Sequence, residues 1–443
     1  MSPPRLGSAV IPRHIVSMRK NIAVLSTACI LGAASSYAEE RQPAAFPGDA
    51  APPSEANEAA PPADDTFELR ASWRDGLRLQ SGDGSFVVKL RGRIHSDWAA
   101  AFSNRELRDD FPSVSSSDSG TRLRRARLGV SGTLYRNFVF SAEYDFAGGE
   151  AKPKDVYLGV QGIPWAGRSG VGHFKAPFSM ETIASANDIT FLERGLPEAL
   201  VPVRNAGLMA SNLVLDDRAT WAVGVFRDVD DTGDGFGEDE LWNLTGRITA
   251  LPFLTEDGKR LAHVGMSYSH KFRDDDEFQV SSRPEAGLFG ARLVDSGSLL
   301  TDGVDLLGHE LALAWGPWTL QAEYVRAWVA SSGADESWDG TYVELSWVLT
   351  GESRPYDARN ADFDGVEPRR PFDPSEGGWG AWEAAVRHSW LDLDDTGGEL
   401  NDVTVGLNWY LNANARLMLN YVHGDVSGSG ATNIVEARAQ VAF

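Results

Sequence analysis

Basic side chains recur at every second position in two stretches of the sequence. Lys89, Arg91 and Arg93 form one row, and Arg125 and Arg127 form a second. Successive side chains of a β-strand point to opposite faces, so a spacing of two places each row on one face of a strand. Rows of guanidinium and ammonium groups attract anions, and the paired donors of arginine match the geometry of phosphate. These rows could therefore form an anion-binding surface on a sheet.

The residues around the first row predict the strand that would carry it. From Phe86 onward apolar and polar residues alternate, and the face opposite to the basic row holds Phe86, Val88, Leu90, Gly92, Ile94 and Trp98. This pattern predicts a strand of about thirteen residues. Similar alternation recurs in segments 126–134, 138–146, 156–160, 221–225, 244–250, 264–268, 311–315, 320–324, 343–347, 382–390, 403–409 and 417–421. These are the clearest segments, and over the whole chain we expect about sixteen strands.

The connections between these segments come in two sizes. Short connections such as 316–317 and 412–414 alternate with long polar ones such as 228–240 and 351–378. Barrels of outer membranes have tight turns on the periplasmic side and larger loops on the outer side. This pattern indicates a membrane barrel in which the long segments are outer loops.

Aromatic residues mark the ends of the predicted strands. Trp98, Tyr268, Trp315 and Trp409 are among those that lie at or near a strand end, as the aromatic girdles at lipid–water boundaries require. The last strand alternates in the same way and ends in Phe443, which looks like the signal that outer-membrane assembly machinery recognises. An open sheet edge is not stable in lipid. We therefore predict an all-β protein, a closed transmembrane antiparallel β-barrel.

The 443-residue chain divides into three parts. Residues 1–38 hold four basic and no acidic side chains, a short apolar stretch and small residues before Glu39, which predicts a signal peptide cleaved after Ala38. Residues 39–66 are rich in proline, alanine and acidic residues and predict a disordered periplasmic spacer. Residues 67–443 would form the barrel.

Composition and motifs exclude several classes of function. The net charge of −22 argues against a nucleic-acid partner, because binding to a polyanion needs a basic surface. The sequence holds neither H-E-x-x-H nor G-x-S-x-G, so we expect no enzyme activity and no cofactor. One acidic stretch, with Asp228, Asp230, Asp234 and Asp239, resembles half of a calcium-binding loop, although an acidic outer loop needs no ion to be soluble.

Several motifs, taken in order, resemble the phosphate-selective porin family of Gram-negative outer membranes, the porin O and P type. They are residues 73–79, 124–130, 143–146, 174–179, 189–194, 349–352 and 406–410. The resemblance implies a sixteen-stranded barrel in the outer membrane that assembles as a trimer. It also implies a third outer loop, here about residues 179–205, that folds inward and narrows the channel.

The same resemblance implies which residues contact the solute. Family members pass phosphate or polyphosphate along basic side chains, and the matching residues here are Lys89, Arg91, Arg93, Arg125 and Arg127. The inward loop would add Lys175, Arg194 and Arg204 near the constriction. The protein would then act as a passive channel for small anions, with phosphate preferred.

Acidic residues on the inward face leave a second interpretation open. The inward positions also hold Glu143, Asp145, Asp155, Glu323, Glu344, Glu383 and Glu436. Charges of both signs would hydrate the lumen of a general, weakly selective porin. A barrel without a channel, used as an enzyme or adhesin, is a further alternative.

Overall fold

The computed structural model describes residues 68–73, 76–235, 241–393 and 397–443. The chain divides into two units, Met1–Asp65 and Thr66–Phe443, and all described residues belong to the second. The predicted signal peptide and spacer lie outside the described residues.

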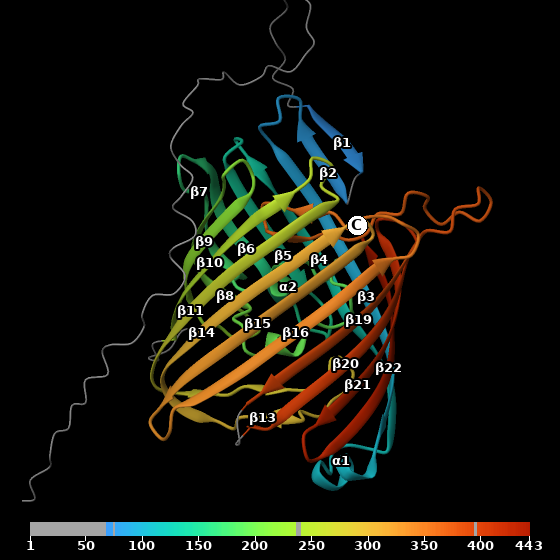
Figure 1. The fold of residues 1–443 in the computed structure, drawn as a ribbon. Coiled ribbons are helices and arrows are strands. Elements are labelled where there is room, and N and C mark those ends of the chain that lie inside the picture. The colour runs from blue at the N-terminus through green and yellow to red at the C-terminus, as the bar shows by residue number, and fades with distance from the viewer. Residues whose placement is uncertain (1–67, 74–75, 236–240, 394–396) are drawn as a thin grey trace, which may run out of the picture. The chain divides into compact units, whose positions relative to one another are not determined.

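The main sheet of the described residues has 18 strands, of which the first two are short and the other sixteen close into a ring (Figure 1). Each strand of the ring pairs antiparallel with its neighbours along the chain, and the last strand pairs with the first. The sixteen strands are β3 (Val87–Ser103), β4 (Ser117–Leu134), β5 (Phe138–Asp145), β6 (Lys152–Ile163), β7 (Gly167–Lys175), β8 (Arg204–Val214), β9 (Ala219–Arg227), β10 (Trp242–Leu254), β11 (Arg260–Phe278), β14 (Leu299–Trp315), β15 (Trp318–Ser331), β16 (Glu336–Val348), β19 (Ala381–Asp392), β20 (Glu399–Tyr410), β21 (Ala415–Val426) and β22 (Gly430–Ala442). The predicted barrel and its strand number are confirmed.

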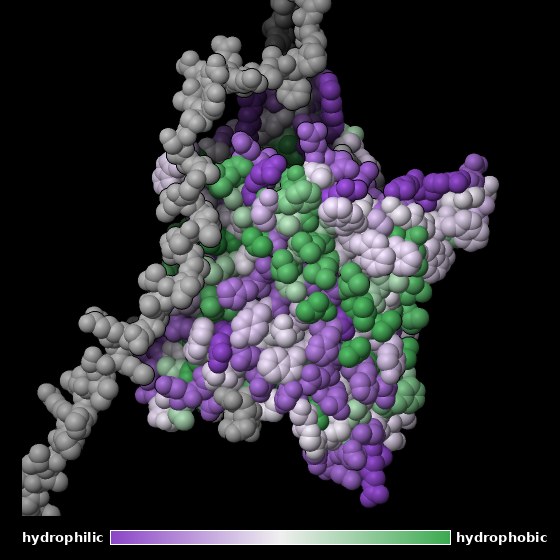
Figure 2. All heavy atoms as spheres, in the orientation of Figure 1, coloured by the Kyte–Doolittle hydropathy of each residue, from purple (hydrophilic) through white to green (hydrophobic). Residues whose placement is uncertain are grey.

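The alternation of apolar and polar residues in the sequence corresponds to the two faces of the barrel wall. On β3, Ile94 and Trp98 are about half exposed, whereas His95 and Asp97 are buried. Trp318 stacks on Trp347 at the end of the barrel that holds the C-terminus. Figure 2 shows apolar side chains grouped on one face of the barrel wall. The outer surface thus has the apolar, aromatic-rimmed character that lipid requires.

The first two strands, β1 (Leu69–Trp73) and β2 (Leu77–Ser81), form a hairpin that continues into β3. Phe443 lies next to this hairpin, and its ring stacks on Trp73. The backbone N–H of Gly92 donates to the carbonyl of Phe443 at 2.6 Å, and the N–H of Phe443 donates back at 2.8 Å. The last residue of the chain therefore extends the pairing that closes the ring.

Three connecting segments fill the interior of the barrel. Residues 176–203 hold α2 (Met180–Ile183) and a 3-10 turn, η1 (Leu196–Ala199), and α2 is seen inside the ring in Figure 1. Residues 279–298 hold β12 (Ser281–Ser282) and β13 (Val294–Asp295). Phe178, Leu196 and Leu200 pack in one buried cluster with wall residues of β14 to β16. The expected inward folding of the segment at 179–205 is confirmed.

The third segment, residues 349–380, contradicts one expectation. It connects β16 to β19 and therefore lies at the end with the short turns and the C-terminus, where the N–H of Phe372 donates to Leu411. Its length suggested an outer loop, but its first part folds back into the barrel as β17 (Tyr356–Asp357) and β18 (Asp362–Phe363). Residues 369–377 are exposed and project away from the barrel as the orange loop in Figure 1. Phe363 packs with Met180 in a buried cluster, so burial within the lumen stabilises this long segment.

Helices are minor elements of the described residues. The connection between β3 and β4 holds α1 (Arg105–Asp110), which begins at the N-cap Asn104. Among the residues that the structure describes, no helix has the length and apolarity needed to cross a bilayer.

The seam between β22 and β3 can be tested at Gly92. A Cβ on Gly92 would lie 2.4 Å from the Phe443 ring, so Gly92→Leu would displace that ring and lower the stability by about 1–3 kcal/mol. The measurement is the temperature at which the folded band of the protein converts to the unfolded band on a gel. The control is Gly82→Leu, since no atom lies within 4 Å of the position of its Cβ. Equal temperatures for the two variants would contradict the prediction.

Candidate functional site

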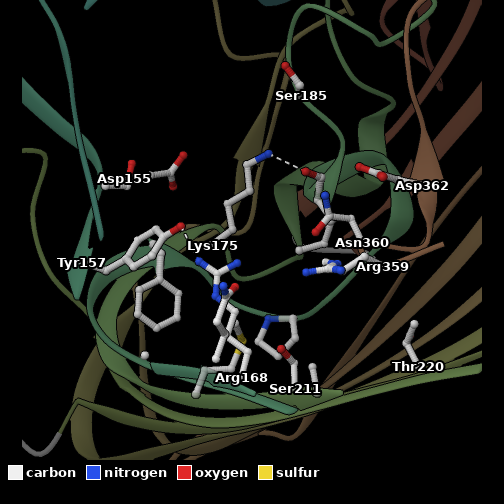
Figure 3. A pocket seen from close by; sticks show the side chains of 18 of the residues that line it. Asp155, Tyr157, Arg168, Lys175, Ser185, Ser211, Thr220, Arg359, Asn360 and Asp362 are labelled. Carbon is white, nitrogen blue, oxygen red and sulfur yellow. Dashed lines mark hydrogen bonds between the residues drawn. The ribbon is translucent and has the colours of Figure 1, made fainter. Parts of the chain in front are cut away.

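A cavity of about 1060 Å³ lies inside the barrel, between β3 to β10 and the inward segments (Figure 3). It opens beside the short turns, where Arg136 and Asn212 line it, and it reaches Ile183 and Ser185 of the inward segment 176–203. In the described part of the chain its wall includes eleven Lys or Arg residues against six Asp or Glu residues. The cavity is therefore basic although the whole chain is strongly acidic.

The structure brings seven of the eight predicted basic residues to this cavity. They are Arg91, Arg93, Arg125, Arg127, Lys175, Arg194 and Arg204. Lys89 is exposed and is not part of the wall of the cavity. The cavity reaches Arg91 but not Lys89, so the basic row of β3 contributes its last two members.

Four of these cations pair with carboxylates. Arg127 contacts Glu143 at 3.2 Å and Asp145 at 2.7 Å, and Glu143 also accepts from Arg93 at 3.1 Å. In the same way Arg204 donates twice to Asp155, at 3.1 Å each, and Arg194 pairs with Glu198 at 2.9 Å. Acidic residues close to the basic rows thus neutralise part of their charge.

Three others have no carboxylate within ion-pair distance in the described ranges. Arg91 lines the cavity, and its Nε has no hydrogen-bond partner there. Arg125 is buried, with Nη1 3.3 Å from Nδ1 of His95. Lys175 donates from Nζ to the carbonyls of Ile183 and Ala184, at 2.8 Å each. None of these three side chains is paired directly with a carboxylate among the described residues.

The structure adds four cavity-lining arginines that the sequence interpretation missed, namely Arg136, Arg168, Arg247 and Arg359. Arg168 lies at the start of β7, and its Nη2 donates to the Tyr157 hydroxyl at 2.7 Å. Arg359 belongs to the segment 349–380, which was expected outside the barrel. Arg168 shares its face of β7 with Gly170 and Phe174, which also line the cavity, but Lys175 has the opposite parity and gave no indication of it. No local pattern marks Arg359.

A β-bulge explains a further group of arginines that alternation did not predict. On β4, Arg125 faces His95 but Leu123 faces Ser96, so Arg124 is an extra residue and the parity changes. Arg124 then pairs with Glu193 at 2.7 Å, and two nitrogens of Arg122 are buried without an acceptor among the described residues. Burial favours the neutral form of Glu193, but Arg124 outweighs it and lowers the pKa of this carboxyl well below its ordinary value.

The inward acidic residues of the opposite wall do not line the cavity. Glu323 accepts the N–H of Glu181 and the hydroxyl of Tyr342, at 2.7 Å each. Glu344 accepts from the hydroxyl of Thr190 at 3.0 Å, and Glu383 accepts from side chains of β20. Glu436 is buried too. Glu323 and Glu344 therefore bind inward segment 176–203, and none of these four side chains lines the cavity.

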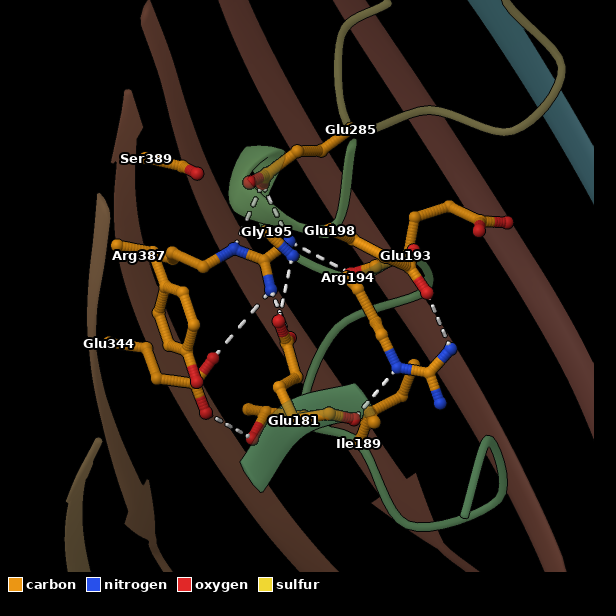
Figure 4. A network of polar contacts seen from close by, with 12 residues as sticks. Glu181, Ile189, Glu193, Arg194, Gly195, Glu198, Glu285, Glu344, Arg387 and Ser389 are labelled. Carbon is orange, nitrogen blue, oxygen red and sulfur yellow. Dashed lines mark hydrogen bonds and ion pairs between the residues drawn. The ribbon is translucent and has the colours of Figure 1, made fainter. Parts of the chain in front are cut away.

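One buried arginine connects two inward segments to the wall (Figure 4). Arg387 of β19 contacts Glu285 at 2.6 Å and Glu181 at 2.9 Å, and its guanidinium also donates to the carbonyl of Glu193. Glu344 lies 3.7 Å away. A second contact joins inward segment 349–380 to inward segment 176–203, because Arg354 donates to the hydroxyl of Thr190. These contacts fix the segments that border the cavity.

The candidate calcium loop lacks support in the described residues, which hold no group of three His, Cys, Asp or Glu residues that could bind a metal. Asp228 instead accepts from Asn205 at 2.7 Å and pairs with Lys271 and Arg273. Asp230 accepts from residues of its own turn, and Asp239 lies outside the described residues.

Comparison with known proteins identifies the family. Residues 88–443 match the model of the phosphate-selective porin O and P family. The chain belongs to this family. Porin O of Pseudomonas aeruginosa is 26% identical over 418 residues, which is 83% of this chain and 91% of that protein. This protein is therefore an outer-membrane porin of a Gram-negative bacterium.

Solved structures of outer-membrane proteins share the fold of this porin. A form of OmpT of Vibrio cholerae that lacks loop L8 has a TM-score of 0.52 at 13% identity, covering 81% of this chain and 100% of that chain. The outer membrane channel DcaP of Acinetobacter baumannii has a TM-score of 0.51 at 12% identity, covering 82% and 99%. At these identities the likeness concerns the fold alone.

The role of Arg387 can be tested by removing its charge. Arg387→Met leaves Glu181, Glu285 and Glu344 without their cation, and loss of one partner of a buried ion pair costs about 3–5 kcal/mol. We expect loosened inward segments, measured as increased current noise in single-channel recordings and faster proteolysis within 176–203. The control is Arg105→Met on α1, where the pair with Asp109 is exposed. Native noise and native proteolysis in Arg387→Met would refute this role.

Proposed function

We propose that this porin passes small anions, with phosphate as its preferred solute. The observation that carries the proposal is the unequal use of inward charges. The acidic residues of β15, β16 and β19 are occupied by contacts with other protein groups, whereas Arg91, Arg125 and Lys175 keep cationic groups without a carboxylate partner in the described residues. A solute in the cavity therefore meets more positive than negative charge.

Phosphate fits this wall because arginine offers paired donors to its oxygens. Passage also requires that binding remain weak enough for release, and a series of separate cations provides several weak sites. A general porin is the alternative, since Asp155, Asp188 and Asp362 also line the cavity. The two interpretations differ in whether phosphate blocks the chloride current.

Family membership and the barrel fold favour a passive channel over an enzyme. Trimer formation is proposed on the family resemblance alone. Recognition of the last strand by the barrel assembly machinery is supported by β22, where Val435 and Val441 face outward and Phe443 ends the chain.

The cations without a partner should determine selectivity. We expect the double variant Arg91→Glu with Arg125→Gln to lower the anion-over-cation permeability ratio by about threefold or more, because the local anion concentration falls with the local potential. The ratio is measured from reversal potentials in a salt gradient. Lys89→Gln is the control, since Lys89 does not line the cavity. An unchanged permeability ratio in the double variant would contradict the proposal that these cations determine anion selectivity.

Phosphate added to channels that conduct chloride distinguishes the two interpretations. Half-block at a low phosphate concentration supports a binding site, and conductance that phosphate does not change supports a general porin. The double variant should raise the half-blocking concentration while Lys89→Gln leaves it unchanged.

A buried carboxyl at the cavity predicts a pH dependence. Burial raises the pKa of Asp362 to about 7, against the effect of Arg247, with Asp357, Asp364 and Lys175 also close. Asp362 is neutral below this pKa and negative above it, so the anion preference should be stronger at about pH 6 than at about pH 8. Reversal potentials at both values measure this, and Asp362→Asn should give the stronger preference at both. The prediction fails if the native channel shows the same reversal potential throughout.

A further inference from the structure

Part of the cavity wall is apolar. Tyr157 of β6, Phe174 of β7, Met209 of β8 and Phe226 of β9 form one cluster. The ring of Phe174 meets those of Tyr157 and Phe226 edge-on, with centroids 5.7 Å apart in each pair. Phe174 and Phe226 are buried, whereas Tyr157 and Met209 are partly exposed and line the cavity. The cluster therefore supports an apolar surface that faces the solution.

A glycine leaves space beside this surface. Gly170 of β7 pairs with Gly159 of β6, two residues after Tyr157 along that strand. Gly170 lines the cavity, and a Cβ built on it would meet no atom closer than 3.4 Å. A glycine inside a strand often marks a place where a ligand approaches the backbone closely. The wall is therefore hollowed next to the Tyr157 ring.

A cation borders the same hollow. Arg168 donates to the Tyr157 hydroxyl at 2.7 Å, and its guanidinium carbon lies 5.3 Å from the centre of the Tyr157 ring. No carboxylate pairs with Arg168 in the described segments of the chain, so its charge is not neutralised by direct pairing. Figure 3 shows Arg168 and Tyr157 together at one side of the cavity, below Lys175.

We propose that this hollow binds organic anions that carry an aromatic group, such as aryl phosphates. The anionic end contacts Arg168, and the aromatic group lies on the apolar surface formed by Tyr157 and Met209. This inference rests on the proposed anion passage and names a substrate class for it. Inorganic phosphate can use the cations of the cavity but has no apolar surface to bury, so only the organic anion gains from the cluster.

The test compares two dianions that differ in their apolar group. Phenyl phosphate and methyl phosphate are added separately to channels that conduct chloride, and the half-blocking concentration of each is measured. We expect phenyl phosphate to block at a concentration about tenfold lower, the ratio that contact with one aromatic ring provides. Comparable half-blocking concentrations in the native channel would overturn the inference.

Variants locate the preference in the hollow. Tyr157→Ser removes the ring and should bring the ratio of the two half-blocking concentrations to about one. Arg168→Gln should weaken block by phenyl phosphate more than block by inorganic phosphate. The matched control is Arg136→Gln at the cavity rim, which removes a cation but should leave the phenyl-to-methyl ratio unchanged. Heat-modifiable gel migration shows that each variant is folded.

The outcomes separate this inference from the proposed function. A tenfold ratio that survives both Tyr157→Ser and Arg168→Gln would place aryl binding elsewhere and overturn the inference. Anion selectivity and phosphate block with no phenyl preference would overturn the inference alone. A native channel that shows no anion selectivity would instead refute the proposed function.

Discussion

The structure depends on one constraint: lipid offers no hydrogen-bond partners, so the backbone groups of a membrane-embedded sheet must bond to each other. The pairing of β22 with β3 meets this requirement, and Phe443 adds the last pair with Gly92. In a closed wall of this kind, side chains alternate between lipid and lumen. The chemistry of the channel is therefore a question of how the inward positions are used.

Inward charges have two uses in this protein. Glu323 and Glu344, together with Arg387, bind the segment 176–203 and hold it against β15 to β19. The opposite wall, from β3 to β10, carries most of the cations of the cavity. An acidic residue at an inward position thus says little about selectivity until its partner is known. Because segment 176–203 covers Glu323 and Glu344, these carboxylates hold that segment in place and do not form a negatively charged channel wall.

Much of the fold could be predicted because period-two alternation is a local signal. It indicated most of the strands, the ring and the inward direction of Arg91, Arg93, Arg125 and Arg127, but it did not mark β7 and β8. The sequence could not show that the segment 349–380 enters the lumen from the end with the short turns, because its length is that of an outer loop. It also could not show which carboxylates are covered, since the partners of Glu323 and Glu344 lie far away along the chain.

The bulge in β4 has a consequence for how this wall can evolve. Because Arg124 is an additional residue in this strand, Arg122 and Arg125 both face the lumen although their sequence positions have opposite parity. Deletion of a single codon in this strand would turn one of these arginines toward the hydrocarbon. Substitutions can change the charge of the wall gradually. A change in strand length instead moves a side chain from the lumen face to the lipid face of the wall, or the reverse. The length of this strand therefore determines, as directly as its composition does, which charges face the lumen.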